Sequence, residues 1–314
     1  MCPEPPTRTD PLLAKMKAIE ASAVERSKQR RAQGNLPLDS EAPITAAKVV
    51  KLPLWPDAVR AVPNGFLRSA LFGAIRRGPR RYMKREQIAA LEGIEIYYTG
   101  ERLDQSDLNL WEMILHIARL QGLGNECRVT AYQLLKALGK TDTGKNREIL
   151  DIRLSRMKAT GVDVHIGRFG YEGSLIDEVY RDKETREYVF RANPKLRTLF
   201  EPDQFTQVDW AVRRELDGQP LAQWLHGFYA SHAQPYPISI AKLHELSGSE
   251  ASEHWKFAQT LRKNLDSLAK ASAMHGQPFR YSIQNDVVHA DKIPSRSQQH
   301  HLTKKPVKSI TKKI

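Results

Sequence analysis

The segment that most constrains the fold is residues 253–273, EHWKFAQTLRKNLDSLAKASA, because its apolar residues recur at the spacing of a long helix. Phe257, Leu261 and Leu265 lie on one stripe of that helix, and such a stripe faces a hydrophobic core. At about 100° per residue, the opposite face collects cationic and hydrogen-bonding side chains. That face holds Lys256, Gln259, Thr260, Lys263, Ser267 and Lys270. It suits the major groove of a DNA duplex, whereas the alternative interpretation is an ordinary solvated helix face.

The residues around this helix predict a winged helix. Residues 238–248 have the pattern of a short amphipathic helix that ends at Gly248. Residues 279–283 and 286–290 are rich in β-forming residues and are separated by Gln284 and Asn285, which predicts a β-hairpin. A short helix, a turn, a long basic helix and a hairpin together make a winged-helix domain.

The same order of elements occurs earlier in the chain. Trp111 and Trp224 are 113 positions apart, and Gly139 and Gly248 are 109 apart. Offsets this similar indicate two copies of one unit, so we predict the α+β fold class with tandem winged-helix domains. The first copy is expected to comprise a helix over residues 104–120, a strand over 127–130, helices over 131–139 and 146–160, and strands over 162–167, 174–180 and 187–192.

Composition divides the chain into four parts. The formal net charge of +13 and the pI of about 9.7 indicate a polyanionic partner, either nucleic acid or an anionic membrane surface. Residues 93–291 carry 25 cationic and 27 anionic side chains, so the excess charge lies in the flanks. The predicted parts are a flexible arm over residues 1–50, a first winged-helix domain with a basic N-terminal extension over 51–200, a second winged-helix domain over 201–291, and a disordered lysine-rich tail over 292–314.

Two further groups of cations are candidate DNA contacts. The first group lies in the basic extension and comprises Arg76, Arg77, Arg80, Arg81, Lys84 and Arg85. Such a cluster suits the neutralisation of DNA phosphates, with a solvated surface and a basic membrane helix as alternatives. The second group lies on the long helix of the first copy, whose apolar stripe is less regular, and comprises Lys145, Arg147 and Arg153.

One pattern favours an enzyme. Residues 139–146, GKTDTGKN, match the spacing of a phosphate-binding loop, but Asn146 stands where the magnesium-binding Ser or Thr belongs. Residues 132–138 also predict a helix, whereas a phosphate loop follows a buried strand. We therefore expect no nucleotide site and interpret Lys145 and its glycines as a helix-turn-helix turn.

Histidines and cysteines give no metal or catalytic pattern. His226 and His232 flank Tyr229 on a helix that must also bury apolar residues, which favours core histidines over a nicking enzyme. The tail pair His300 and His301 lacks neighbouring ligands. We predict no catalytic residue, no metal and no cofactor.

The expected location is the cytoplasm. The only cysteines are Cys2 and Cys127, which are too few for a disulfide framework and agree with a reducing compartment. No window approaches 18 uninterrupted apolar residues, and the first ten residues lack the apolar core of a signal peptide. We predict no membrane association.

Three long runs of sequence carry a family resemblance. They are LPLWPDAVRAVPNGFLRSALF (52–72), KREQIAALEGIEIYYTGERLDQSDLNLWEMILHIARLQGLGN (84–125) and LAQWLHGFYASHAQPYPISIAKLHELSGS (221–249). Together they resemble the TrfA family of plasmid replication initiators. The resemblance implies tandem winged-helix domains that bind directly repeated sites, called iterons, at a plasmid origin. It also implies origin opening with the host initiator DnaA, recruitment of the replicative helicase, contact with the polymerase sliding clamp, and dimers that become monomers to initiate.

The clamp-binding pattern of that family is roughly Gln-Leu-Ser/Asp-Leu-Phe. The stretch KLPLW keeps both leucines and an aromatic residue, at Leu52, Leu54 and Trp55, but lacks the glutamine and the small polar residue. These three residues are the candidate clamp contacts. The alternative is that the stretch packs on the first domain as a strand or staple.

The resulting hypothesis is a non-enzymatic plasmid replication initiator that binds double-stranded origin DNA. A winged-helix transcriptional regulator is the alternative, since it shares the domain type but needs no helicase or clamp contact. A structural dimerisation module is the simplest alternative, and it predicts no salt-sensitive DNA binding.

Overall fold

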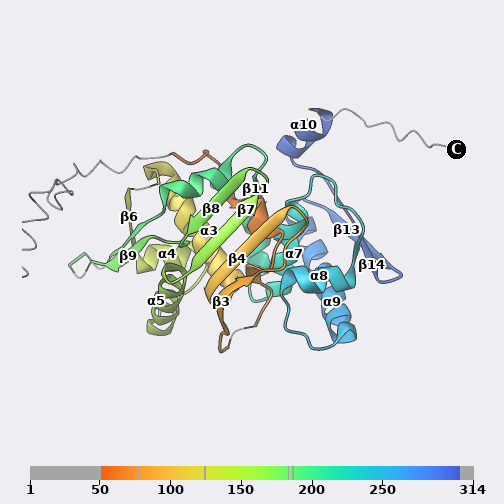
Figure 1. Ribbon diagram of the computed structural model, residues 1–314, viewed down its shortest axis with the longest axis horizontal. Helices are drawn as coiled ribbons and strands as arrows, with labels where there is room; N and C mark the ends of the chain where they lie inside the picture. The colour runs from red at the N-terminus through yellow and green to blue at the C-terminus, as the bar shows by residue number, and fades with distance from the viewer. Residues whose placement is uncertain (1–50, 77, 124, 183, 186, 305–314) are drawn as a thin grey trace, which may run out of the picture. The chain divides into compact units, whose positions relative to one another are not determined.

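The computed structural model describes residues 51–76, 78–123, 125–182, 184–185 and 187–304, which belong to one compact unit. The predicted arm over residues 1–50 lies outside the described residues. Helices and mostly antiparallel sheets share the unit, so the fold is α+β (Figure 1). The helices are α2 (Asn64–Leu67), α3 (Gln105–Gln121), α4 (Ala131–Ala137), α5 (Gly144–Lys158), the 3₁₀ helix η1 (Pro194–Phe200), α6 (Trp210–Glu215), α7 (Pro220–Ala230), α8 (Ile240–Ser247), α9 (His254–Met274) and α10 (Arg296–Lys304).

Most strands form small sheets. The strands are β1 (Val59–Pro63), β2 (Phe72–Gly73), β3 (Tyr82–Gln87), β4 (Ile94–Glu101), β5 (Leu103–Asp104), β6 (Glu126–Thr130), β7 (Gly161–Ile166), β8 (Phe169–Gly173), β9 (Glu178–Arg181), β10 (Glu187–Arg191), β11 (Phe205–Asp209), β12 (Ile238–Ser239), β13 (Phe279–Gln284) and β14 (Val287–Lys292). The largest sheet has the order β3-β4-β7-β8, while β1 pairs with β11.

Two halves of the unit repeat one topology. In the first half, α3, β6, α4 and α5 precede the hairpin β9–β10, and the sheet order is β6-β10-β9. In the second half, α7, β12, α8 and α9 precede the hairpin β13–β14, and the sheet order is β12-β14-β13. In both halves the short strand before the helix pair therefore joins the second strand of the hairpin.

The first half differs by an insertion. The strand predicted over residues 162–167 is β7, but it pairs with β4 and β8 instead of with the hairpin of its own half. Side chains on the buried face of β7, such as Val162 and Val164, enter the core together with Ile96 of β4. The basic extension thereby becomes part of the first half, because β3 forms the edge of this sheet.

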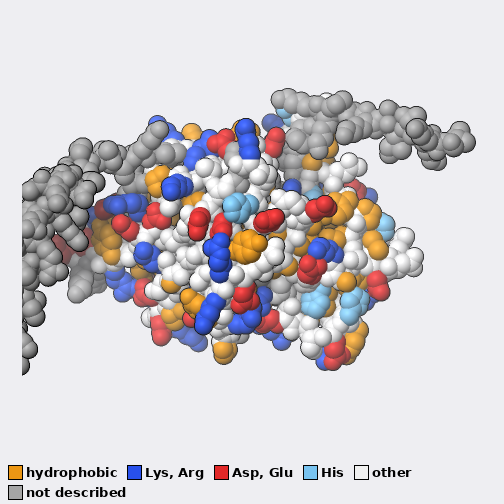
Figure 2. All heavy atoms as spheres, viewed as in Figure 1, with side chains coloured by type: hydrophobic (Ala, Val, Ile, Leu, Met, Phe, Trp, Pro, Cys, Tyr) orange, Lys and Arg blue, Asp and Glu red, His pale blue; other side chains and the backbone are white. Residues whose placement is uncertain are grey.

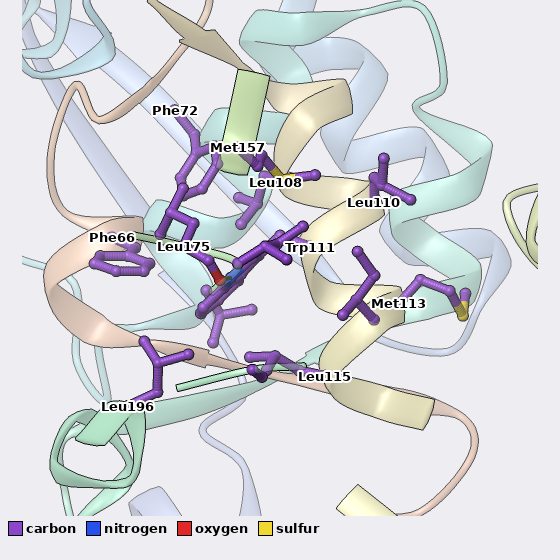
Figure 3. Packing of buried hydrophobic residues seen from close by; sticks show 14 of the residues in the cluster. Phe66, Phe72, Leu108, Leu110, Trp111, Met113, Leu115, Met157, Leu175 and Leu196 are labelled. Atoms are coloured by element: carbon purple, nitrogen blue, oxygen red, sulfur yellow. Dashed lines mark hydrogen bonds between the residues drawn. The ribbon is translucent and has the colours of Figure 1, made fainter. Parts of the chain in front are cut away.

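Each half has its own hydrophobic cluster. In the first, Trp111 of α3 packs against Phe66, with ring centroids 5.2 Å apart, and donates from Nε1 to the carbonyl of Leu175 at 3.1 Å (Figure 3). In the second, Trp224 of α7 stacks on Phe228 at 4.9 Å. The two tryptophans that reveal the repeat in the sequence therefore anchor the two clusters.

The second hairpin turns one residue later than predicted. Asn285 and Asp286 both adopt positive φ, 48° and 58°, which is the geometry of a type I′ turn. Gln284 is the last residue of β13 and pairs with Val287. Asn and Asp tolerate the left-handed region better than Gln does, and this preference sets the position of the turn.

The expected disorder of residues 292–314 needs correction for part of the segment. Residues 296–304 form α10, and residues 305–314 lie outside the described part of the chain. Gln298 Nε2 donates to the carbonyl of Ala230 at 2.7 Å, and Lys292 Nζ donates to Gln298 Oε1 at 2.8 Å. These contacts fix α10 on the end of α7, an interaction that the polar composition of the tail did not indicate.

Candidate nucleic-acid interface

Helix α9 separates its side chains into a buried stripe and a polar face. Phe257, Leu261, Leu265 and Leu268 are all buried in the second cluster, as their spacing predicts. The preceding helix α8 ends at Gly248, whose φ of 59° reverses the chain into the turn before α9. The turn and the buried stripe together fix which face of α9 meets solvent.

The exposed face of α9 carries the predicted base contacts. Lys256, Gln259, Thr260 and Lys263 are all exposed. Lys256 Nζ makes one surface ion pair with Glu253 at 2.9 Å, and Thr260 Oγ1 donates to the carbonyl of Lys256 at 2.9 Å. Among the described residues Lys263 has no ion pair, so its ammonium group is available to a phosphate or a base.

This face forms one wall of a groove of about 1570 Å³. The other walls come from the first half, through Arg76 and the start of α3, and from the loop that leads into α7. Two groups that are far apart in the sequence are thus brought together, because Arg76 lines the same groove as Lys256 and Lys263. In Figure 1, α5 lies at the lower left and α9 at the lower right of the ribbon, with β3 between them.

Two of the candidate DNA contacts are not exposed, namely Arg80, predicted to contact phosphates, and Arg153, predicted to contact DNA from the first half. Arg80 pairs with Asp104, and Arg153 Nη1 lies 3.2 Å from both Asp104 and Asp107. Their side chains are nearly buried because the two carboxylates lie at the start of α3, beneath the surface. Arg156, which sequence reasoning did not select, joins the same cluster at 3.1 Å from Asp107.

Burial and the neighbouring arginines act in opposite directions on the pKa values of this acidic pair. The pKa of Asp107 rises to about 6, because burial and the neighbouring Asp104 charge outweigh the attraction of Arg153 and Arg156. For Asp104, burial acts in the same direction, but Arg153 and Arg80 together hold its net pKa below the ordinary value. Asp104 also caps α3, accepting from the backbone amides of Ser106 and Asp107 at 2.8 Å.

The remaining cations of the basic extension differ in their availability. Arg76 and Lys84 are exposed. Arg81 pairs with Glu86, and Arg85 Nη2 lies 3.1 Å from Asp163, although both arginines keep exposed side chains. Arg77 lies outside the described residues. On the face of the molecule shown in Figure 2, Lys and Arg side chains are interspersed with Asp and Glu side chains, so positive charge is gathered only locally.

The first half presents Lys145 and Arg147 near the start of α5, and both side chains are exposed. Arg147 makes two hydrogen bonds of 2.6 Å to Asp142, the residue before the N-cap Thr143. That ion pair places the guanidinium over the turn between α4 and α5. Lys145 is therefore the better candidate for a DNA contact in this half.

The stretch that resembles a clamp-binding motif packs mostly into the first half. Leu52 and Trp55 are buried, and Leu54 is 75% exposed. Trp55 Nε1 donates to His116 Nδ1 at 3.0 Å, and its ring stacks on Phe200 with centroids 6.2 Å apart. The predicted clamp contact stays untested, but two of its three side chains already serve the core of this chain.

The glycine-rich segment after α4 is a turn between two helices. Gly139 has φ of 71° and follows α4, and Gly144 is the first residue of α5. The segment before Gly139 is a helix, so the strand that a phosphate loop requires is not at this position. Lys145 consequently lies in the first turn of α5.

His226 of α7 and His232, which lies two residues after the end of that helix, are buried, as is Tyr229. His232 Nδ1 lies 2.7 Å from the carbonyl of Phe228, whereas His226 Nδ1 and Tyr229 Oη have no hydrogen-bond partner among the described atoms. Burial lowers the pKa of His226 to about 3 and that of His232 to about 4. The part of the chain that the structure describes contains no group of three or more His, Cys, Asp or Glu residues that could hold a metal.

One exposed aromatic side chain escaped the sequence reasoning. Trp255, in the first turn of α9, is 61% exposed, and Lys256 Nζ lies 5.3 Å from its ring centroid. A solvent-exposed tryptophan beside a cation at the edge of a polar helix face is unusual for a purely structural residue. The signal was present in the helical pattern, which places Trp255 off the buried stripe.

Within the described ranges no helix is long and apolar enough to cross a bilayer. A family model described as TrfA protein matches residues 44–292 of this chain. The plasmid replication initiator protein TrfA of Escherichia coli is 27% identical over 259 residues, which cover 80% of this chain and 64% of the length of that protein. A crystal structure of domains 2 and 3 of RctB aligns with a TM-score of 0.48 and 12% identity, covering 74% of this chain and 96% of the other.

Proposed function

This chain belongs to the TrfA protein family, and from that premise we propose that it is a plasmid replication initiator that binds duplex DNA through two winged-helix domains. The repeated topology supports this proposal, since each half combines a helix pair with a three-stranded sheet and a hairpin. In a winged helix the second helix of the pair enters the major groove. The proposed recognition helices are α5 and α9.

The observation that carries the proposal is the groove beside α9. It combines hydrogen-bonding side chains suited to base edges, Gln259 and Thr260, with the cations Lys256, Lys263 and Arg76. Cations from two distant parts of the chain converge there, and the two carboxylates that also line the groove, Asp104 and Glu250, are paired with Arg80 and Arg102. Local gathering of charge in a wide groove is what binding to DNA phosphates requires.

The proposal extends to the origin and to partners. We propose that the DNA contains directly repeated iterons, that binding opens the origin together with DnaA, and that the replicative helicase and sliding clamp are then recruited in the cytoplasm. A dimer that dissociates to an active monomer belongs to the same proposal. The absence of a catalytic group is also part of it, since the chain would act by binding and deforming DNA.

A replication assay tests this function directly. The gene and its flanking DNA are placed on a circle without another origin, and the circle is expected to replicate only when the chain is intact. A stop codon early in the gene is the control, with the protein supplied from a second plasmid to restore replication. Failure of the supplied protein to restore replication would contradict the proposal.

A second measurement separates an initiator from a transcriptional regulator. The purified full chain is added to the supercoiled circle together with DnaA, and unpaired bases are detected with a single-strand-specific nuclease. An initiator is expected to produce nuclease cuts beside its own footprint. A footprint without any cuts would favour the regulator.

A further inference from the structure

Arg213 lies fully buried where the two halves meet. It belongs to α6 in the second half and is 0% exposed. Its Nε donates to Asn109 Oδ1 at 2.6 Å and its Nη2 donates to Gln105 Oε1 at 3.0 Å, both on α3 of the first half. Its Nη1 donates to the carbonyl of Gln223 on α7 at 3.2 Å. One guanidinium thus ties α3 to α6 and α7.

A buried carboxylate balances this guanidinium. Glu112 of α3 is fully buried, and its Oε2 lies 3.3 Å from Arg213 Nε without a hydrogen bond in the described structure. The remaining cation beside Glu112 is Arg60 of β1. Buried charges keep their positions only while their partners stay in place, so this pair resists sliding of α3 against α6.

The same helix α3 also holds the proposed recognition helix of the first half. Asp104 and Asp107, at its start, bind Arg153 and Arg156 of α5. On the other side, α7 packs against α9, and the backbone amide of Ala222 donates to Asn264 Oδ1 of α9 at 3.1 Å. A path of buried and partly buried polar contacts therefore runs from α5 through α3 and Arg213 to α7 and α9.

We propose that Arg213 is a positioning residue that fixes the distance and angle between α5 and α9, so that the protein selects DNA by the spacing of two half-sites. This inference rests on the proposed function, because it requires both helices to enter DNA. Two half-sites bound by rigidly joined units must lie at one spacing along the duplex. If the contacts of Arg213 with α3 are weakened, the second unit is no longer held at its half-site once the first unit has bound. Binding to the selected duplex then weakens, and duplexes with other spacings are bound with a smaller loss of affinity.

The competing explanation is that Arg213 contributes only to stability. A stability role predicts that variants change the folded fraction but leave the dependence on spacing unchanged. The distinguishing measurement is therefore a ratio of affinities on two duplexes, taken under conditions where every variant is folded by circular dichroism.

The probe is a duplex that the wild-type full chain selects from a random-sequence pool, with the two protected stretches located by hydroxyl-radical footprinting. A second duplex carries five extra base pairs between those stretches, which turns one half-site by about half a helical turn. For the wild type we expect the insertion to weaken binding about 100-fold, because both units no longer engage together.

Two variants loosen the joint to different degrees. Asn109→Ala removes one partner of Arg213, and the double variant Arg213→Met, Glu112→Met removes both members of the buried ion pair, while the neighbouring Arg60 keeps its hydrogen bonds to the carbonyls of Asp57 and Val59. We expect weaker binding to the selected duplex and an insertion penalty of about tenfold or less in the double variant, with an intermediate penalty for Asn109→Ala. The control is Arg119→Met, a buried arginine that binds Asp57 and the carbonyl of Trp55 within the first half.

The outcomes separate the inference from the function. The insertion penalty of Arg119→Met is expected to equal that of the wild type. If both Arg213-joint variants also show the wild-type penalty, the positioning role of Arg213 is overturned, while the proposed DNA binding stands. If a variant folds only at low temperature, its binding and that of the wild type are both measured at that temperature. The ratio of affinities for the two duplexes then still distinguishes the two explanations. If the wild type selects no duplex at all, the proposed function itself fails.

Discussion

At the scale of single residues, the function of an arginine or lysine in this chain depends on its surroundings. Arg153 and Lys263 both lie on long basic helices, yet Arg153 is held by two buried carboxylates whereas Lys263 is exposed. Arg213 is buried completely and joins the two halves. Cationic side chains therefore have three roles in this chain: Arg213 connects the two halves, Arg153 connects α5 to α3, and Lys263 is a candidate DNA contact.

Lys263→Ala tests the candidate base contact on α9. We expect the selected duplex to be bound about 1 to 3 kcal/mol more weakly, with the preference at one base pair relaxed. The matched control is Lys195→Ala, an exposed lysine at the start of η1 that does not line the groove. Fluorescence anisotropy on selected and random duplexes checks the result, and an equal loss on both would show that Lys263 contacts only phosphate.

His226 predicts a pH dependence of stability. Its folded pKa of about 3, lowered by burial and by the charges of Arg213 and Lys292, is below the value near 6.5 of an unfolded histidine. The unfolded chain therefore binds the extra proton, and the contribution of this group is present above pH 6.5 and is lost as the pH falls toward 3. Between pH 6 and 4.5 the free energy of unfolding should fall by about 1.4 kcal/mol per pH unit from this group.

The measurement is urea denaturation of the wild type and His226→Leu at several pH values. The free energy of unfolding of His226→Leu is expected to decrease less steeply on acidification, because its unfolding takes up as much as one proton fewer than that of the wild type. The control His289→Leu, which alters an exposed histidine, should match the wild type. Identical slopes for wild type and His226→Leu would mean that His226 is accessible to protons in the folded protein. His232 and His116, both with pKa values lowered to about 4, act in the same direction, whereas Asp107, with its pKa raised to about 6, acts in the opposite direction.

At the scale of elements, the orientation of α9 depends on the turn that precedes it. Gly248 has φ of 59°, and a Cβ there would lie 2.9 Å from the Cβ of Ala70 in the first half. The short helix, its glycine and the first half are therefore in close contact, as the bond from the Ala74 amide to the Ser247 carbonyl at 2.7 Å also shows. The turn before the proposed recognition helix α9 therefore packs closely against the first half at Ala70.

Gly248→Ala should consequently destabilise the protein by more than backbone strain alone. The left-handed conformation costs an alanine about 1 kcal/mol, and the contact with Ala70 adds to this. Gly276→Ala is the matched control, since Gly276 follows α9 with φ of 70° and has no atom within 4 Å of its Cβ position among the described residues. Urea denaturation is expected to show a larger loss for Gly248→Ala, and equal losses would exclude a steric role for Ala70.

At the scale of the whole molecule, two similar halves are joined so that the basic extension meets α9, the proposed recognition helix of the second half. Arg76 comes from the segment before β3, and it lines a groove whose opposite wall is α9. Trp224 Nε1 donates to the carbonyl of Ser69 at 3.0 Å, which holds the extension against the second half. The candidate interface therefore belongs to the assembled unit and not to either half alone.

Salt dependence measures how many cations contact phosphates. The logarithm of the binding constant should fall linearly with the logarithm of salt concentration, and Arg76→Ala with Lys84→Ala should reduce that slope by about 2. The control pair Lys51→Ala with Lys195→Ala changes net charge equally but alters exposed lysines that belong neither to the groove nor to the group of cations between residues 76 and 85. The same reduction in both pairs would indicate a general effect of net charge.

Much of the local structure could be predicted from the sequence. The stripe of Phe257, Leu261 and Leu265 predicted the buried side of α9, and the offset between Trp111 and Trp224 predicted the repeat of elements. The pairing of β7 with β4 was missed, because a strand pattern does not identify its partner. The pair β1–β11 was missed for the same reason, since its two strands are far apart in the sequence.

The sequence by itself determined the periodic features of this protein, namely the amphipathic helices, the glycine turns and the basic segments, because these depend on neighbours within a few positions. Only the tertiary structure decided which cations remain available. Arg80 and Arg153 are neutralised by Asp104, which is 24 and 49 positions away, and Arg213 is enclosed by residues of α3 more than 100 positions away. Such partners meet only when the chain folds, and in a partly buried environment they decide whether a charge binds protein or DNA.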